Sequence, residues 1–191
     1  MKTIFERIWK LAKPYLDVRN NNIHTEIATK YAYKLLMIEK GDEDIIIPSI
    51  ILHDVGWKNI SEELHLKSFG PNGKEELTKQ HEKESVKIAK KILKEVNYDK
   101  IKTQQILKII EGHDSKKEAI SLNDKLVKDA DKLWRFSKEG FTIDCKRFKQ
   151  TTNERVKAKD TNIALLFTDS AKQIAGEEIK NRLKESKVSQ D

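Results

Sequence analysis

Apolar side chains recur at every third or fourth position along most of this chain, the spacing that places them on one face of a helix. Ile23, Ile27 and Tyr31, for example, share one face of a helix that begins near Asn20. The low content of turn-forming residues, 7 Gly and 3 Pro in 191 residues, favours helices over a β architecture. The pattern therefore predicts an all-α fold. The predicted helices span residues 4–16, 20–39, 41–56, 74–96, 99–112, 121–139, 141–159 and 162–184.

The third predicted helix carries an apolar run that begins at Ile45 and ends directly before His53 and Asp54. Pro48 is compatible with the first turn of this helix, where no backbone N–H is needed. A carboxylate buried beside an imidazole is costly unless its charge is compensated, and a bound metal ion is the commonest compensation. The alternative is that both side chains cap the end of the helix, where the last carbonyl groups need donors.

The chain has the length of one domain, residues 1–191, and shows no repeat or convincing domain boundary. No apolar run approaches the roughly 18 residues of a membrane span, and the N-terminal residues lack the apolar stretch of a signal peptide. Residues 58–73 form the longest segment without periodicity, and such loops are often lids or substrate loops. His65 lies in this segment and is interpreted as a surface residue. The tail after Glu185 is expected to fray.

The net charge of +7 is compatible with a nucleic-acid partner, but the distribution of the charges argues against one. Lysines are spread over every predicted helix and mixed with glutamates, and only six of the basic residues are arginine. The single cysteine, Cys145, excludes an internal disulfide and fits a reducing compartment. We therefore expect a cytoplasmic protein without a membrane partner, for which nucleic acid is an unfavoured ligand.

Six residues near the apolar faces of separate helices are candidate metal ligands. They are His24, His53, Asp54, His81, His113 and Asp131. Such residues on different helices can converge in the centre of a bundle. Imidazole and carboxylate groups together suit Mn, Fe, Co, Ni or Zn and argue against a structural thiolate zinc site. Taken singly, each histidine has the simpler interpretation of a partly buried or helix-end residue.

Three motifs occur in a recognisable order: Ile23-His24-Thr25, Ile51-Leu52-His53-Asp54-Val55-Gly56 and Lys128-Asp129-Ala130-Asp131-Lys132-Leu133. Over roughly residues 23–136 this order resembles that of the HD superfamily of metal-dependent phosphohydrolases. The resemblance implies a single-domain all-α bundle of about five core helices with additional C-terminal helices. Residues 20–140 would form the HD-type core, and residues 141–185 a C-terminal helical extension.

The resemblance implies that a metal ion is bound by His24, His53, Asp54 and Asp131. Asp129 competes for the last position, and Asp131 is preferred because a basic residue and a leucine follow it directly, as in the family. His81 and His113 stand where some HD proteins bind a second ion that the doublet aspartate bridges; helix-end histidines without a metal are the equally open alternative. The implied cofactor is one divalent ion or a binuclear pair of Mn, Fe, Co, Ni or Zn, with Mg as a further candidate.

The implied activity is hydrolysis of a phosphate ester or anhydride by a metal-activated water, and small stand-alone HD proteins often act on nucleotides. In this hypothesis Asp54 bridges the metals or orients the nucleophile. Candidate phosphate clamps, each also interpretable as a solvated surface residue, are Lys58, Lys132 and Arg135. Candidate stacking partners for a base, each also interpretable as a core residue, are Trp57, Phe69, Trp134 and Phe141.

Two other function classes remain open. One is a catalytically inactive HD-type module that binds a metal or a nucleotide and has a regulatory role. The other is a basic helical protein that binds nucleic acid. The sequence leaves the substrate, the bond that is cleaved and the oligomeric state undetermined, so monophosphatase, pyrophosphohydrolase and phosphodiesterase activities are all compatible with it.

Overall fold

The computed structural model describes residues 1–65 and 75–188, and within these ranges the chain forms helices and no strand. The all-α prediction is therefore confirmed. The α-helices are α1 (Thr3–Ala12), α2 (Asn21–Leu36), α3 (Glu43–Leu52), α4 (Glu62–His65), α5 (Glu75–Glu95), α6 (Lys100–Ile110), α7 (Leu122–Leu133), α8 (Lys138–Phe148), α9 (Thr152–Ile163) and α10 (Asp169–Val188). Short 3₁₀ helices are η1 (Lys13–Tyr15), η2 (Val55–Asn59) and η4 (Trp134–Phe136). Residues 66–74, with Phe69 and most of the predicted loop, and residues 189–191 lie outside the described ranges.

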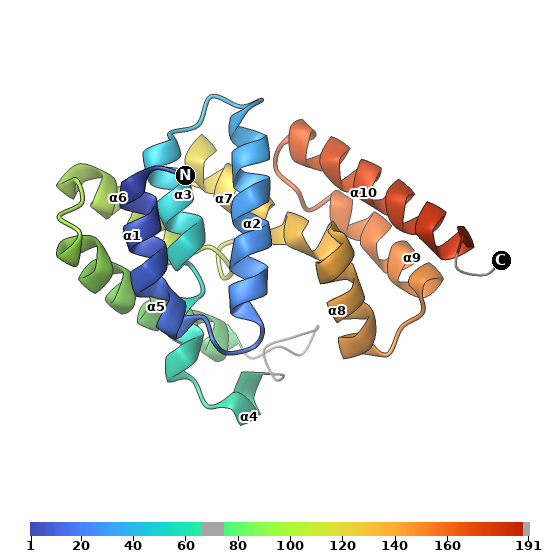
Figure 1. The fold of residues 1–191 in the computed structure, drawn as a ribbon, viewed down its shortest axis with the longest axis horizontal. Helices are drawn as coiled ribbons and strands as arrows, with labels where there is room; N and C mark the ends of the chain where they lie inside the picture. The colour runs from blue at the N-terminus through green and yellow to red at the C-terminus, as the bar shows by residue number, and fades with distance from the viewer. Residues whose placement is uncertain (66–74, 189–191) are drawn as a thin grey trace.

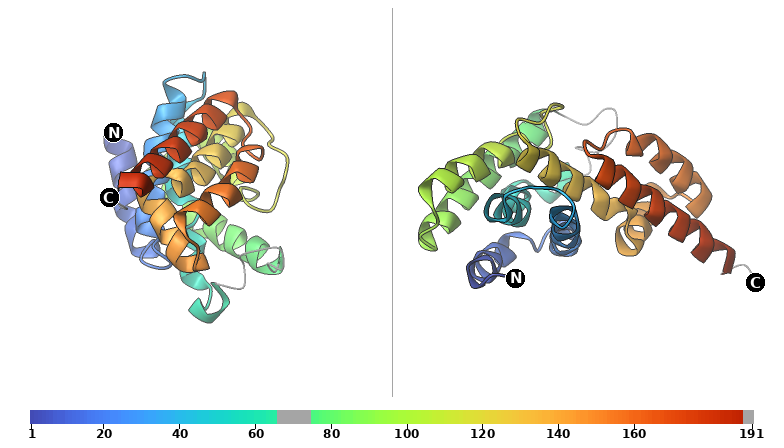
Figure 2. Two further views of the ribbon diagram at one scale, coloured as in Figure 1. Left: turned by 90° about the vertical axis from the view of Figure 1, so that its right-hand side faces the viewer. Right: turned by 90° about the horizontal axis from the view of Figure 1, so that it is seen from above.

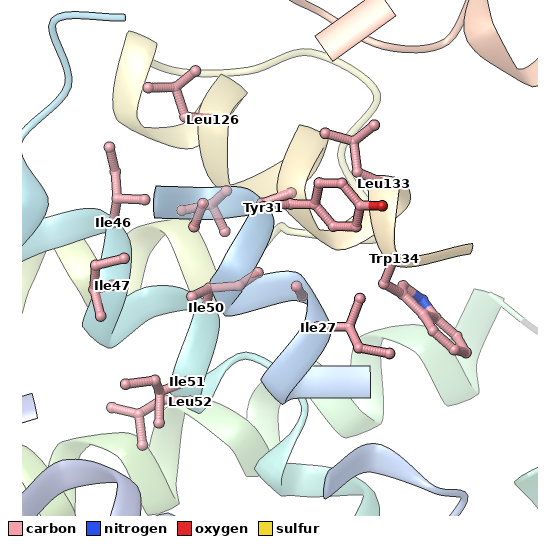
Figure 3. Close-up of a cluster of buried hydrophobic side chains, with 14 of the residues drawn as sticks. Ile27, Tyr31, Ile46, Ile47, Ile50, Ile51, Leu52, Leu126, Leu133 and Trp134 are labelled. Atoms are coloured by element: carbon pink, nitrogen blue, oxygen red, sulfur yellow. The ribbon is translucent and has the colours of Figure 1, made fainter. Parts of the chain in front are cut away.

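Helix α3 lies at the centre of the bundle, and every residue from Ile45 to Leu52 is buried. Helices α1, α2, α6 and α7 pack around it (Figure 1). Figure 3 shows Ile46 and Ile50 of α3 in one cluster with Ile27 of α2 and Leu126 of α7. A helix that is covered on all sides needs a continuous apolar run, and the C-terminal end of this helix carries His53 and Asp54 into the interior.

Pro48 lies inside α3 rather than in its first turn, because the helix already begins at Glu43 behind the N-cap of Asp42. A proline at this position has no N–H for the carbonyl group of Asp44, four residues earlier. The hydroxyl of Tyr98 donates a hydrogen bond to that carbonyl at 2.6 Å instead. The internal proline is thus compensated by a side chain from the connection between α5 and α6, and α3 continues without a break to the candidate site.

Gly56 allows η2 to lie directly on α5. A Cβ atom at this position would collide with the carbonyl oxygen of His81 and the backbone nitrogen of Ser85. The amide of Gly56 also donates to the hydroxyl of Ser85 at 2.9 Å. This close approach places His81 of α5 opposite Asp54.

The boundaries of the C-terminal helices differ from the prediction. The predicted break at Gly140 is wrong, because this glycine lies inside α8, where a Cβ atom would collide with the carbonyl group of Trp134. The break lies earlier, at Ser137, whose hydroxyl accepts a hydrogen bond from the amide of Gly140 at 3.1 Å. The predicted helix over 141–159 is divided at Lys149, which has a φ of 52°, and Thr151 begins α9 with a capping box. The last helix, α10, begins at residue 169 instead of residue 162.

Helices α8, α9 and α10 lie together beside the bundle, on the right in Figure 1 and again on one side of the view from above in Figure 2. Asp129 of α7 holds the connection between α9 and α10. Its carboxylate accepts hydrogen bonds from the amides of Phe167 and Thr168 at 2.7 and 2.9 Å, and from the Thr168 hydroxyl at 2.7 Å. Across residues 1–65 and 75–188, none of the helices combines the length and the apolar character that crossing a bilayer requires.

Candidate metal centre

Four of the five histidines and two aspartates converge at the C-terminal end of α3. They are His24 of α2, His53 and Asp54 at the end of α3, His81 of α5, His113 in the turn after α6, and Asp131 of α7. Each of the four histidines is at most 5% exposed. The structure therefore brings together all six residues that the sequence analysis names as candidate ligands.

The first cluster consists of His24, His53 and Asp131. The Nε2 atoms of the two imidazoles lie 2.9 Å apart. Asp131 Oδ1 lies 3.2 Å from the Nε2 atom of His24 and 3.4 Å from that of His53. Asp54 Oδ2 lies 3.6 and 3.7 Å from the same two nitrogen atoms. Asp129, the alternative to Asp131, instead binds the α9–α10 connection.

The second cluster consists of His81, His113 and Asp114. The two Nε2 atoms lie 3.3 Å apart, and Asp54 Oδ1 lies 3.6 Å from that of His81 and 3.5 Å from that of His113. Asp114 Oδ2 lies 3.7 and 3.8 Å from the same nitrogen atoms. Asp114 is not among the residues expected from the sequence. Each cluster thus has two imidazoles, one carboxylate of its own and one oxygen atom of the shared Asp54.

Backbone carbonyl groups orient one imidazole in each cluster. His53 Nδ1 lies 2.8 Å from the carbonyl oxygen of Ile50, and His113 Nδ1 lies 2.8 Å from that of Ile110. Because a carbonyl group only accepts hydrogen bonds, each Nδ1 atom carries the hydrogen and donates it. In the neutral imidazole the Nε2 lone pair then points into the cluster, which is the arrangement found in metal-binding histidines.

The spacing within the first cluster fits a bound metal ion. Bonds of about 2.1 Å at angles between about 90° and 110° separate two ligand atoms by about 2.9 to 3.4 Å. The three shortest separations, 2.9, 3.2 and 3.4 Å, fall within this range. The chemistry of the donors agrees, because imidazole nitrogen and carboxylate oxygen are ligands for divalent transition metals.

The carboxylates of Asp54 and Asp131 stay ionised, because the pKa of each is held well below its usual value. Burial alone raises the pKa of Asp54, but His53 and His113 outweigh it and hold this pKa well below its usual value. His24 and His53 do the same for Asp131. In the second cluster, burial and the neighbouring His113 lower the pKa of His81 to about 4. His113 itself has a pKa raised to about 10, because Asp114 and Asp54 outweigh its burial.

Buried Glu82 supports the second cluster from behind. Its Oε1 atom accepts hydrogen bonds from the amides of Asp114 and Ser115 at 2.9 and 2.8 Å, and Oε2 accepts one from the Ser115 hydroxyl at 2.7 Å. These bonds fix the turn that carries His113 and Asp114. Glu82 directly follows His81 in the sequence, and this proximity is the only local signal of its role.

Two of the three candidate phosphate clamps lie away from the clusters. The ammonium group of Lys58 forms an ion pair with Asp17 at 2.7 Å. That of Lys132 lies 4.9 Å from the centre of the Phe167 ring and 3.5 Å from the carbonyl oxygen of Leu165. The structure thus brings neither lysine to the candidate ligands.

Trp57 supports the second cluster instead of offering a free face to a base. Its ring stacks on that of His81 with centroids 4.3 Å apart, and the guanidinium of Arg19 lies 3.6 Å from the centre of the same ring. Its Nε1 atom donates to Asp54 Oδ1 at 3.1 Å. The interpretation of His65 as a surface residue is wrong, because it is buried with its ring centroid 5.4 Å from that of Trp57.

A cavity of about 540 Å³ opens beside both clusters. His24, Asp54, Asp114 and Asp131 contribute to its wall. The other charged lining residues are Arg19, Arg135, Arg147 and Arg155. Of these arginines, only Arg135 is expected from the sequence. Trp134 also lines the cavity, with its ring centroid 4.8 Å from that of His24, whereas Phe141 does not line it. Both side chains are buried in the core.

A comparison with known protein families agrees with this geometry. The HD domain matches residues 22–135, which is more than half of the chain and includes all six expected ligands. The chain belongs to the HD domain family. HD domains bind divalent metal ions and are generally metal-dependent hydrolases. Comparison with curated proteins and with solved structures gave no match. Helices α8 to α10 lie beyond the matched residues.

Proposed function

We propose that this protein is a metal-dependent phosphohydrolase that cleaves a phosphate ester or anhydride of a nucleotide. The observation that supports this proposal best is the position of Asp54, whose two carboxylate oxygens face two separate pairs of imidazoles. A carboxylate in this position can join two metal ions. Sites with two metal ions about 3.5 to 4 Å apart are typical of phosphatases and nucleases.

Each cluster would hold one divalent ion, of Mn, Fe, Co, Ni or Zn, with Mg as a further candidate. The ligands of the first would be His24, His53 and Asp131, and those of the second His81, His113 and Asp114, with Asp54 shared. Such ions supply a nucleophilic water near neutral pH and polarise the phosphate group. During hydrolysis the bond from phosphorus to the leaving oxygen breaks, a water oxygen takes its place, and the leaving oxygen gains a proton.

The wall of the cavity suits a phosphorylated substrate. Arg19 lines the cavity together with Asp54 and is held over the Trp57 ring, so its guanidinium is suited to bind an oxygen of the reacting phosphate. The cavity volume of about 540 Å³ lies within the range of about 300 to 1,000 Å³ that is usual for small-molecule sites. Phe148, which is 37% exposed, provides aromatic surface for a base.

The distribution of arginine supports a small substrate over nucleic acid. Four of the six arginines line this one cavity. A reader of nucleic-acid backbones presents its cations along an extended surface instead. We therefore propose a nucleotide-sized substrate in a cytoplasmic protein, with no membrane or nucleic-acid partner.

The proposal is tested by the metal content of the purified protein together with hydrolysis of a panel of nucleotides. We expect about one or two equivalents of a transition metal and metal-dependent phosphate release. His53→Ala should lose both. His65→Gln is the matched control, because His65 is also buried but belongs to neither cluster, and it should retain both.

Two results would count against the proposal. Absence of metal uptake after incubation with Mn, Co, Ni and Zn would refute a metal-dependent activity. Full metal loading without hydrolysis of any nucleotide would favour the inactive regulatory module.

A further inference from the structure

A buried aspartate outside the metal centre gathers three arginines. Asp144 of α8 is fully buried, and its carboxylate contacts Arg155 of α9, Arg135 of η4 at 3.5 Å and Arg147 of α8 at 3.6 Å. Arg147 and Arg155 lie beyond the residues that match the HD domain, and Arg135 is the last residue of that match. This arginine cluster (Arg135, Arg147 and Arg155) is therefore largely a property of the C-terminal helices, which lie together in Figure 1.

The three guanidinium groups of the arginine cluster converge at one place in the wall of the cavity. Three guanidinium groups, which keep their charge at every physiological pH, face a single carboxylate. Burial and then repulsion from Arg135 lower the pKa of Arg147. The cavity gives an anion access to the cluster, because all three arginines line the cavity whereas Asp144 does not.

The guanidinium groups are held in place before any ligand arrives. The amide oxygen of Gln150 accepts a hydrogen bond from Arg155 Nη1 at 3.2 Å, and the guanidinium of Arg155 lies 4.8 Å from the centre of the Phe148 ring. Asp144 fixes the three arginines from behind. Guanidinium groups fixed in this way lose little side-chain entropy on binding, which favours tight recognition of phosphate oxygens.

The arginine cluster lies beside the metal centre rather than within it. Arg135 follows Asp131 by four residues, which corresponds to about 6 Å along a helix. Two divalent ions would leave a small positive excess over the carboxylates of Asp54, Asp114 and Asp131, and a single phosphate group is sufficient to neutralise it. The arginine cluster, which lines the same cavity, therefore offers hydrogen-bond donors to a further anionic group on the same substrate.

We propose that the arginine cluster binds a second phosphate or pyrophosphate group of the substrate while another phosphate of the same molecule reacts at the metal centre. The substrate is accordingly a nucleotide with two or more phosphate groups, and nucleoside monophosphates are poor substrates. This inference rests on the proposed hydrolase function for the reacting phosphate. The anion site itself depends only on the arginine cluster.

A binding experiment tests the site without relying on catalysis. Inorganic pyrophosphate is titrated into the metal-free protein in the presence of chelator, with the heat of binding as the readout. Arg147→Gln should weaken binding about tenfold, because hydrogen bonds to charged groups contribute about 1.5 to 3 kcal/mol. His53→Ala should bind pyrophosphate like the unmodified protein. Arg7→Gln is the matched control, because Arg7 is exposed on α1 and is remote from the cavity lining.

A kinetic experiment tests the substrate class. The ratio of kcat/KM for a nucleoside diphosphate to kcat/KM for p-nitrophenyl phosphate is compared between the unmodified protein and Arg147→Gln. The ratio should fall about tenfold in the variant, mainly through KM. A purely structural role would lower both values in parallel and leave the ratio unchanged. Arg135→Gln serves as a second variant if Arg147→Gln fails to fold.

The two proposals fail in different ways. Pyrophosphate binding that is lost in both arginine variants supports the anion site even if no compound is hydrolysed, in which case only the hydrolase function is refuted. Metal-dependent hydrolysis with unchanged pyrophosphate binding and an unchanged ratio in both variants would overturn the anion site and leave the hydrolase function standing.

Discussion

Two aspartates near one cavity each gather basic side chains around a single carboxylate. Asp54 has the Nε2 atoms of four histidines within 3.7 Å of its oxygen atoms. Asp144 has three guanidinium groups within 3.6 Å. The side chain of Asp54 is 14% exposed and lines the cavity, whereas Asp144 is fully buried and does not.

The difference between the two sites lies in the basicity of the surrounding groups. An imidazole can lose its proton near neutral pH and then offers a lone pair to a metal ion. A guanidinium group keeps its charge and offers only hydrogen-bond donors. The same arrangement around a carboxylate therefore fits the two proposals, a site for cations at Asp54 and a site for anions at the arginine cluster around Asp144.

The largest expected effect is on kcat, and it distinguishes Asp54 from Asp144. Asp54→Asn removes the carboxylate that both clusters share, so kcat should fall about a thousandfold even with excess metal. Elemental analysis should show that the variant binds less metal. Asp144→Asn is the matched control with the same substitution, and it should retain its full metal content. Equal metal loss in both variants would show that the two sites are not independent.

The next expected effect is on the free energy of unfolding, and it concerns Asp144 instead of Asp54. Asp144→Asn leaves three arginines without their carboxylate, and loss of one member of a buried ionic group costs about 3 kcal/mol or more. Urea denaturation of the metal-free protein should show this decrease in the free energy of unfolding. Asp169→Asn, at a fully exposed carboxylate that pairs with Lys172, should leave it unchanged. A decrease of less than about 1 kcal/mol for Asp144→Asn would mean that water already screens the arginine cluster.

A smaller expected effect tests whether Glu82, which lies outside the clusters, contributes to the affinity for metal. Glu82→Gln weakens the hydrogen bonds to the turn that carries His113 and Asp114, so affinity for metal in the second cluster should fall about tenfold. Competition with a chelator measures this affinity. Glu84→Gln provides the control, because Glu84 is two residues away on α5 and pairs with Lys87 and Asn59 instead. An identical affinity in both variants would assign Glu82 to the fold alone.

The smallest expected effect is on the stability of α3, the helix that leads to Asp54. Tyr98→Phe removes the donor to the carbonyl group of Asp44 and should cost about 1 kcal/mol of stability. In a Pro48→Ala background the new amide can take the role of that donor, so the same substitution should cost less. Thermal unfolding of the four proteins gives the coupling energy. A coupling of zero would contradict the compensation described for Pro48.

The sequence is sufficient to name six residues that the structure brings together, because short motifs place each of them on a helix or at its end. Asp114 could not be predicted in this way. Adjacent residues on a helix point about 100° apart, but His113 and Asp114 lie in the turn after α6, where both face the same cluster. Lys132, the neighbour of Asp131, is also a candidate phosphate clamp in the sequence analysis, with a solvated surface residue as the alternative, and the helical rotation turns this lysine toward Phe167.

The arginine cluster could not be predicted from local patterns. Arg135, Arg147 and Arg155 come from three different elements, and only the packing of α8 and α9 brings them around Asp144. Gly140 is a second position at which the local pattern predicts the wrong structure. A glycine followed by a more polar segment suggests the end of a helix, whereas here the glycine is needed for close contact with Trp134 inside α8.

Helix α7 also determines the reach of the site. Asp131 on this helix belongs to the first cluster, while Asp129 binds the backbone amides of the α9–α10 connection. One rigid helix is thereby attached to the metal centre and to the helices beside the arginine cluster. Under the two proposals made above, the distance between these two sites would select substrates by the spacing of their phosphate groups, whatever base they carry.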